Sequence, residues 1–350
     1  MTARLLGIGT ATPSGRLDQA AAAQMVATIA DASPGRARAM AHLYEQSGIE
    51  HRAMAILDGT RQTYYNGIIP DTAHRMRTFH ELAPPLAHQA SKRAIEAAGV
   101  DARNITHLVT ASCTGLASPG VDIALIGSLG LEASVQRVNI GFMGCHAALN
   151  AIRTARALAM AEPSSCVLVC CAELCSLHIQ ASQADGCAVA DALFADGAAA
   201  CVIDADSAAG APILRRSASI LLPQSLEAMG WHIGEAGFRM SLSPNVPDIL
   251  ARSVRPWIED VLRRERLAIE DVAAWAIHPG GPRVLASVAG ALSLDAAATR
   301  ASGDVLRTHG NMSSATILFI LEKLLQQQHA GPLVALAFGP GLTGEALLLA

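Results

Sequence analysis

The strongest constraint on the fold of this chain is a regular alternation of short apolar runs with alanine-rich stretches. Residues 106–113, 166–174 and 197–206 are apolar runs of strand length, whereas 119–130 and 146–161 have the length and composition of helices. Strands that alternate with helices in this way indicate βα units and a largely parallel sheet that is buried on both faces. The predicted fold class is therefore α/β.

The second half of the chain repeats this order of elements. Its expected elements are an amphipathic helix at 249–267, a strand and turn at 273–281, a long helix at 311–328 and a closing hairpin at 332–350. Each half then presents a strand, a turn that carries a reactive residue, and a helix that begins at that turn. We therefore predict two related halves, residues 1–204 and 217–350, packed back to back and joined by a surface crossover at 205–216.

Composition and charge exclude several classes of function. A net charge of −4 provides no general basic surface for nucleic acid. No apolar run reaches the roughly 18 residues that a membrane span requires. The N-terminal segment lacks the apolar stretch of a secretion signal, so we expect a cytoplasmic protein whose eight cysteines are reduced.

Four of the cysteines are clustered and invite interpretation as a metal site. They are Cys166, Cys170, Cys171 and Cys175. Residues 166–174 form a predicted strand, in which Cys170 and Cys171 would point to opposite faces and could not share one ion. Packing is therefore the preferred role of these thiols, and no metal site is predicted.

Cys145 is the first candidate catalytic residue. It lies in a glycine-flanked turn at 141–148, where an apolar strand ends and an alanine-rich helix begins. A thiol at a helix N-terminus is exposed to the positive end of the helix dipole and to unpaired N–H groups, which can lower its pKa to about 3.5–7.5. The other interpretation is a small residue chosen for tight packing, because a lone cysteine needs a histidine partner to become a credible nucleophile.

His278 and Asn311 are the candidate partners of that thiol. His278 ends a predicted strand and precedes the rigid turn Pro279–Pro282, while Asn311 follows Gly310 at the start of a predicted helix. Side chains of this kind can donate hydrogen bonds to a thioester oxygen, as enolate and oxyanion chemistry requires. Taken separately, the histidine could simply pack on a strand and the asparagine could cap a helix.

These motifs together resemble the type III polyketide synthases of the chalcone and stilbene synthase superfamily, over nearly the whole chain. The segments that carry the resemblance are Gly144-Cys145, 192–200 (ALFADGAAA), 277–282 (IHPGGP), 310–315 (GNMSSA) and 338–343 (FGPGLT). β-Ketoacyl-ACP synthase III enzymes share the Cys-His-Asn chemistry. The last three of these segments are nevertheless similar to the polyketide synthases.

The resemblance implies a five-layered αβαβα thiolase fold and a homodimer. It also implies that Cys145 accepts the starter acyl group from an acyl-CoA as a thioester. His278 would form an ion pair with the Cys145 thiolate and, with Asn311, bind malonyl-CoA so that loss of CO₂ gives the attacking enolate. The substrates are CoA thioesters, and no metal or redox cofactor is required.

The resemblance also identifies the residues that shape the cavity. Phe194 matches the first gatekeeper phenylalanine of the family, and the softer Met240 occupies the position of the second. Trp231 stands where plant enzymes carry a glycine that sets the cavity volume. We therefore expect a narrowed cavity that prefers medium or long aliphatic acyl-CoAs to p-coumaroyl-CoA, with an alkylpyrone or alkylresorcinol as product.

Four further residues are expected at the cavity wall. Cys113 and His178 stand where plant enzymes carry threonine, Ser313 matches a serine near the nucleophile, and Cys175 is expected to line the cavity without reacting. His178 could act as a second base for cyclisation, but a histidine on a buried strand is more often simply hydrogen-bonded, which is the preferred interpretation.

The residues that bind the CoA phosphates are less well defined. The segment 45–52 aligns with a basic segment of the plant enzymes, but of its charge only Arg52, with His51, remains. Arg283 is the other candidate for phosphate binding. A carrier-dependent β-ketoacyl synthase and a non-catalytic thiolase-fold scaffold remain as alternative functions.

Overall fold

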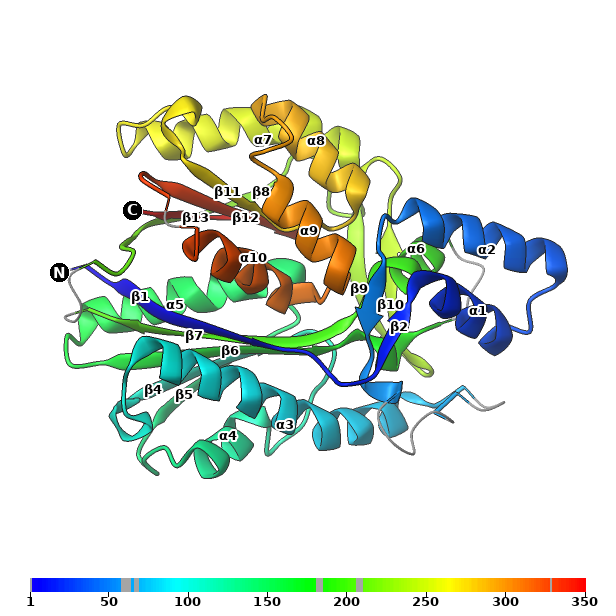
Figure 1. Cartoon of the computed structure of the whole chain (residues 1–350), viewed down its shortest axis with the longest axis horizontal. Helices are drawn as coiled ribbons and strands as arrows, with labels where there is room; N and C mark the ends of the chain where they lie inside the picture. Colours follow the sequence, from blue (N-terminus) through cyan, green and yellow to red (C-terminus); the bar gives the residue numbers. More distant parts are fainter. Residues whose placement is uncertain (1, 58–63, 66–68, 181–184, 206–209, 328) are drawn as a thin grey trace.

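Helices and strands of the chain form five layers, in the order helix, sheet, helix, sheet, helix (Figure 1). The computed structural model describes residues 2–57, 64–65, 69–180, 185–205, 210–327 and 329–350. The predicted αβαβα arrangement is therefore confirmed. Both termini lie at the same end of the layers (Figure 1, left).

The first sheet is mixed, not largely parallel as predicted. Its five strands lie in the order β1 (Arg4–Ala11), β7 (Asp196–Asp204), β6 (Cys166–Leu174), β4 (His107–Ser112) and β5 (Gln136–Gly141). β6, β4 and β5 are parallel, but β7 runs antiparallel to both of its neighbours. The prediction is wrong here because the helix between β6 and β7, α6 (Asp185–Leu193), packs against β10 and α2 instead of crossing a face of the sheet.

The second sheet is also mixed. Its four strands lie in the order β11 (Ala274–Ile277), β12 (Leu333–Gly339), β13 (Thr343–Leu349) and β8 (Leu214–Leu221). β12 and β13 form the predicted closing hairpin, and β11 pairs with β12 in parallel. The predicted crossover at 205–216 ends early, because Leu214 is buried and already begins β8.

Two helices fill the space between the sheets, α5 (Ala147–Ala161) and α10 (Thr316–Leu325) (Figure 1). The outer faces of the sheets are covered by α3 (Thr72–Ala98) and α4 (Val121–Leu129) on one side, and by α7 (Val246–Arg263) and α8 (Pro282–Leu292) on the other. A Cβ added at Gly9 of β1 would lie 2.3 Å from the backbone of α3, so the absence of a side chain there lets this helix approach the sheet.

The clustered cysteines belong to different packing layers. Cys170 packs in the core between β6 and α3, and Cys171 packs in the core between the two sheets. The two thiols therefore lie on opposite faces of β6, as the strand pattern predicted.

A further group of elements covers one end of the layers (Figure 1, right). This group contains α1 (Gln19–Ile29), α2 (Pro34–Gln46), α6, the pair β2 (Arg16–Asp18) and β3 (His51–Ala53), and the hairpin β9 (Met229–Gly234) and β10 (Gly237–Leu242). Helix α9 (Arg300–His309) connects α8 to the turn before α10. In the part of the chain that the structure describes, no helix combines the length and hydropathy needed to span a membrane.

Candidate active site

The turn that carries Cys145 joins β5 to α5 and is sharply bent. Phe142 has a positive φ of 58° and Gly144 one of 80°. A Cβ on Gly144 would lie 2.2 Å from Pro340 Cδ, so this position requires glycine both for its conformation and for its close packing. The bend places Cys145 in a short 3₁₀ turn (Gly144–His146) directly before α5.

His278 follows β11 and is fixed through its backbone. Its N–H donates to Leu336 O on β12 at 2.8 Å, and its carbonyl accepts from Gly280 N–H at 3.1 Å. The imidazole is 1% exposed, and neither ring nitrogen has a hydrogen-bond partner among the residues that the structure describes. Buried polar groups are rarely left unpaired, so this ring is available to a ligand or to the thiol.

Asn311 connects the two halves of the chain. Its N–H donates to Leu193 O and its carbonyl accepts from Ala195 N–H, both at 2.9 Å. Its side-chain Oδ1 accepts from Ser313 N–H at 2.9 Å. The side-chain amide nitrogen is the donor of the pair, and it hydrogen-bonds to the Cys145 thiol.

Cys145, His278 and Asn311 line one cavity of about 320 Å³. Phe194 and Met240 also border this cavity, with apolar side chains of α7 and the β9–β10 hairpin. The structure thus brings together one residue from the first half of the chain and two from the second. Sequence alone could not show this convergence.

The protonation states at the site differ from the expectation for a helix N-terminus. Burial raises the pKa of Cys145 to about 12, although hydrogen bonding from Ser313 and Asn311 acts in the opposite direction. Burial likewise lowers the pKa of His278 to about 3. Removal from water therefore favours the neutral thiol and the neutral imidazole over the expected thiolate.

Phe194 and Met240 separate the main cavity from a much smaller chamber of about 20 Å³. Trp231 lines this chamber and pairs directly with Met240 across the β9–β10 hairpin. Its indole N–H donates to Cys113 O at 2.7 Å. The ring thus fills the space beyond Phe194 and Met240, where a glycine would leave a chamber.

His178 and Cys175 line the same small chamber. The His178 Nε2–H donates to Thr114 O at 2.7 Å, and its Nδ1 accepts from Phe238 N–H at 3.0 Å. Its ring stacks on Phe238 at 4.2 Å between centroids, and burial lowers its pKa to about 3. Both ring nitrogens already take part in hydrogen bonds. The geometry therefore supports a structural role for His178 and not a role as a second base in cyclisation.

Cys113 lines neither the main cavity nor the small chamber, contrary to expectation. Its Sγ instead accepts a hydrogen bond from Gly144 N–H at 3.0 Å and so supports the turn of the nucleophile. Ser313 does not line the main cavity either, but its side chain hydrogen-bonds to the Cys145 sulfur. The backbone of Ser313 has a positive φ of 47°.

Sequence reasoning missed Glu173, which is fully buried beside these residues. Its carboxyl group accepts from Thr114 Oγ1 at 2.7 Å and from Cys113 N–H at 3.0 Å, and Ser314 Oγ also donates to it. Burial raises its pKa. The sequence did contain an indication that Glu173 is unusual, since it is an ionisable residue inside an otherwise apolar predicted strand.

The structure contradicts the prediction that Arg52 binds CoA phosphates. Arg52 is 1% exposed and donates from one guanidinium nitrogen to Asp191 O and Phe194 O, each at 2.7 Å. It therefore holds the C-terminal end of α6, where Tyr44 also donates to Asp191 O. A phosphate outside the protein cannot reach this guanidinium.

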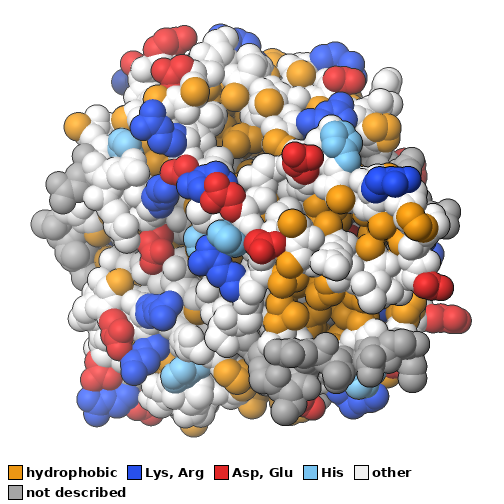
Figure 2. Space-filling view, turned by 45° about the vertical axis from the view of Figure 1, so that its right-hand side comes forward, with side chains coloured by type: hydrophobic (Ala, Val, Ile, Leu, Met, Phe, Trp, Pro, Cys, Tyr) orange, Lys and Arg blue, Asp and Glu red, His pale blue; other side chains and the backbone are white. Residues whose placement is uncertain are grey.

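Arg283, by contrast, is exposed and lines the main cavity. Its position is compatible with the predicted contact to CoA. On the face shown in Figure 2, Lys and Arg side chains are scattered among Asp and Glu instead of forming a continuous basic surface. Within the described residues, no group of three or more His, Cys, Asp or Glu side chains could hold a metal ion.

Comparison with known proteins agrees with this geometry. The family profile of the N-terminal domain of chalcone and stilbene synthases matches residues 1–207, and that of their C-terminal domain matches residues 213–350. The α-pyrone synthesis polyketide synthase-like Pks18 of Mycobacterium tuberculosis is 37% identical over 354 residues, which cover 98% of this chain and 89% of that protein.

Two further relatives point to the same family. The 1,3,6,8-tetrahydroxynaphthalene synthase of Streptomyces peucetius subsp. caesius is 32% identical over 98% of this chain and 91% of its own. The C-terminal type III polyketide synthase domain of Steely1 from Dictyostelium superposes with a TM-score of 0.93 at 28% identity, covering 100% of this chain and 99% of that one. This protein therefore has the thiolase fold, belongs to the chalcone and stilbene synthase family, and is an acyltransferase of the type III polyketide synthase class.

Proposed function

We propose that the protein condenses an acyl-CoA starter with malonyl-CoA units on Cys145 and then cyclises the product. The observation that carries this proposal is the convergence of a buried thiol, an unpaired imidazole and an amide N–H₂ that hydrogen-bonds to the thiol on one cavity. In the first step, Cys145 Sγ attacks the starter thioester carbon while His278 accepts the thiol proton. CoA leaves as its thiol with that proton, and Cys145 keeps the acyl group.

The same side chains then serve the second substrate. The malonyl thioester loses CO₂ by breaking its bond to the carboxylate carbon, and the electron pair becomes an enolate. Asn311 and the N–H of His278 donate hydrogen bonds to the enolate oxygen. The enolate carbon attacks the carbonyl carbon of the Cys145 thioester, and the sulfur leaves as a thiolate that takes up a proton from solvent.

The closed chamber favours aliphatic starters. Trp231 occupies the space beyond Phe194 and Met240, whereas the open part of the cavity is bordered by Leu242, Leu250 and other apolar side chains. A medium or long acyl chain fits such a narrow apolar space better than a rigid aromatic starter. An alkylpyrone or alkylresorcinol is the expected product, and the relative named for α-pyrone synthesis supports the pyrone.

We further propose that the active unit is a homodimer formed along β5. This edge strand has the burial pattern of a partner-binding edge, since five of its six residues are exposed and the sixth, Ile140, is half-buried. Leu116, Ile123, Val138 and Met143 place large apolar side chains near it, each 38–45% exposed. An unpaired edge with apolar neighbours would otherwise be an aggregation site, so a second copy of the chain is the expected partner.

The remaining proposals concern the cellular location of the protein, its cofactors and its partners. All eight cysteines are free thiols in the structure, which supports a reducing, cytoplasmic location. The proposed chemistry uses CoA thioesters and requires neither a metal nor a redox cofactor. Nucleic acid is not proposed as a partner, because the net charge is −4.

One assay separates this function from its alternatives. Purified protein is incubated with malonyl-CoA and acyl-CoAs of graded length, and CO₂, free CoA and pyrones or resorcinols are measured. A scaffold would give none of these, and a carrier-dependent β-ketoacyl synthase would give little without its carrier protein. The Cys145→Ala variant serves as the control and should make no product; product at near wild-type rate from this variant would exclude the mechanism.

A further inference from the structure

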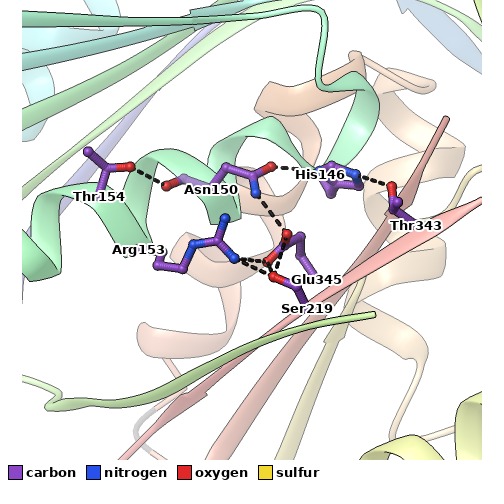
Figure 3. Close-up of polar contacts among 7 residues, drawn as sticks. All are labelled: His146, Asn150, Arg153, Thr154, Ser219, Thr343 and Glu345. Atoms are coloured by element: carbon purple, nitrogen blue, oxygen red, sulfur yellow. Dashed lines mark hydrogen bonds and ion pairs between the residues drawn. The ribbon is translucent and has the colours of Figure 1, made fainter. Parts of the chain in front are cut away.

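The imidazole of His146 has no part in the proposed reaction, although His146 directly follows the nucleophile. Its ring is 2% exposed and lies between the two halves of the chain (Figure 3). Nδ1 lies 2.7 Å from Asn150 Oδ1 on α5, and Nε2 lies 2.6 Å from Thr343 Oγ1 on β13. Both ring nitrogens are therefore occupied, in contrast to those of His278.

The neighbours of Asn150 determine which nitrogen of His146 carries the proton. Asn150 Nδ2 donates to Glu345 Oε1 at 2.8 Å, so Asn150 Oδ1 faces His146 and can only accept. Nδ1 of His146 must then be the donor. Nε2 of the neutral ring accepts from the Thr343 hydroxyl, whose single hydrogen then points to His146 and not to Pro340 O, 2.9 Å from the same oxygen. Glu345 is held in turn by Arg153 at 2.8 Å and by Ser219 Oγ, which completes the network in Figure 3.

The ring also fixes the distance between the two halves at the active site. A Cβ on Gly339, at the end of β12, would lie 2.5 Å from the ring of His146, so the ring packs directly on this backbone. The same strand accepts the backbone N–H of His278 at Leu336 O. β12 thus contacts both His146 and His278, at Gly339 and Leu336, and Cys145 lies next to His146 in sequence.

We propose that His146 is a positioning residue, whose hydrogen bond to Thr343 holds the Cys145 turn at reacting distance from His278. This inference rests on the proposed roles of Cys145 and His278. It predicts that loss of the bond impairs transfer of the acyl group to Cys145. It also predicts that malonyl-CoA decarboxylation is spared, because that step depends on His278 and Asn311 alone.

The charged and titratable groups around the ring agree with a neutral His146. Glu345 faces it from β13, Arg153 from α5, and His278 from the end of β11. Burial lowers the pKa of His146, although the hydrogen bond to Asn150 and the charge of Glu345 act against this. A positive charge on His146 would lower the pKa of His278 and weaken it as a base for the thiol proton.

The test compares Thr343→Val with Thr343→Ser in the full-length protein. Valine keeps the shape of threonine but removes the hydroxyl, whereas serine keeps the hydroxyl. Acyl loading of Cys145 is followed by the mass increase of the protein in a single turnover. Decarboxylation is followed as CO₂ release in the Cys145→Gln background, with and without the same substitutions at Thr343.

We expect Thr343→Val to slow acyl loading by about tenfold or more, since small displacements of reacting groups can reduce rates by about 10²-fold. Thr343→Ser should load within about twofold of wild type, and CO₂ release should change by less than about twofold in either variant. His146→Ala should repeat the loading defect.

Three results would overturn the inference. Normal loading in both Thr343→Val and His146→Ala would show that the bond does not position the thiol. Equal losses of loading and decarboxylation, with a lower melting temperature, would show a general role in folding. A wild-type protein that loads no acyl group at all would refute the proposed function itself, and the first measurement distinguishes this case from the other two.

Discussion

Replacement of Trp231 by glycine tests the proposed shape of the cavity most directly. Trp231 contacts three aromatic rings, with centroid distances of 6.2 Å to Phe194, 5.9 Å to His178 and 6.1 Å to Phe238. Its N–H also bonds to Cys113 O. Removal of the indole should open the small chamber between these rings, next to Met240 and the main cavity.

The expected loss of stability is considerable but tolerable. Truncation of a fully buried tryptophan lowers the free energy of unfolding by about 3–5 kcal/mol, and the half-buried Trp231 should lie at the lower end of this range, with its hydrogen bond contributing roughly 1 kcal/mol. A glycine in a strand adds about 0.5–1 kcal/mol. Domains are stable by about 5–15 kcal/mol, so the melting temperature should fall clearly while the protein remains folded at assay temperature.

The expected gain concerns substrate and product. Each added or removed methylene in an apolar pocket changes specificity by about 1–3 kcal/mol, so starters too bulky for the wild type should gain at least about tenfold in relative kcat/KM. Products should also become longer. Competition assays with p-coumaroyl-CoA and fatty acyl-CoAs, read by mass spectrometry, measure both effects. Trp231→Phe, which keeps most of the ring, is the matched control and should resemble the wild type.

Two outcomes would refute this reasoning. An unchanged product profile in a folded Trp231→Gly variant would show that the indole does not limit the space available to the growing chain. A strong preference of the wild type for p-coumaroyl-CoA would show that the cavity accepts aromatic starters in spite of Trp231.

Three further predictions follow from the site and the surface. Because burial raises the pKa of Cys145 to about 12, its alkylation by iodoacetamide should accelerate about tenfold per pH unit up to pH 9, as the thiolate fraction rises. An alkylation rate that reaches a plateau near pH 7 would instead indicate that the Cys145 thiolate forms an ion pair with His278. Arg52→Gln should lower both the kcat for malonyl-CoA decarboxylation and the melting temperature, with little change in KM, because it releases the carbonyl groups that hold α6 beside Asn311. Arg283→Ala should instead mainly raise KM. A rise in KM alone for Arg52→Gln would show that Arg52 does bind CoA. Val138→Lys should convert the proposed dimer to a monomer in size-exclusion chromatography, since a charge would be buried at the β5 edge. An unchanged elution volume would contradict an interface along β5.

Much of the fold could be predicted from local patterns. The continuous apolar run at 166–174 could only be a strand covered on both faces, and the structure buries every residue of β6. The amphipathic spacing at 249–267 predicted α7, and the glycine-flanked turn before an alanine-rich stretch predicted where α5 begins. These features depend on neighbours within a few residues, so the sequence carries them directly.

Strand direction could not be read in the same way. A helical stretch between two strands predicts a crossover onto a face of the sheet, but α6 packs against α2 and β10 instead, which leaves β7 antiparallel to β6. That choice depends on surfaces contributed by segments that are distant in sequence, since α2 precedes α6 by more than a hundred residues and β10 follows it after three further strands. Only the tertiary structure decides it.

The chemistry of the site also depends partly on local sequence and partly on tertiary structure. The sequence by itself determined that Cys145, His278 and Asn311 are a possible catalytic set, because residue type and the adjoining turns set their chemistry. The tertiary structure decided how strongly each group is held neutral, because burial by distant segments raises the pKa of Cys145 and lowers that of His278.

Two side chains show the same limit most clearly. Arg52 ends a segment expected to bind phosphate, yet the fold turns its guanidinium inward to carbonyl groups more than a hundred residues away in sequence. His146 had no recognisable role until Thr343, 197 positions along the chain, was placed beside it. Local sequence specifies which groups a side chain offers, but only the folded chain specifies which partners and how much water surround it, and these determine what the group does.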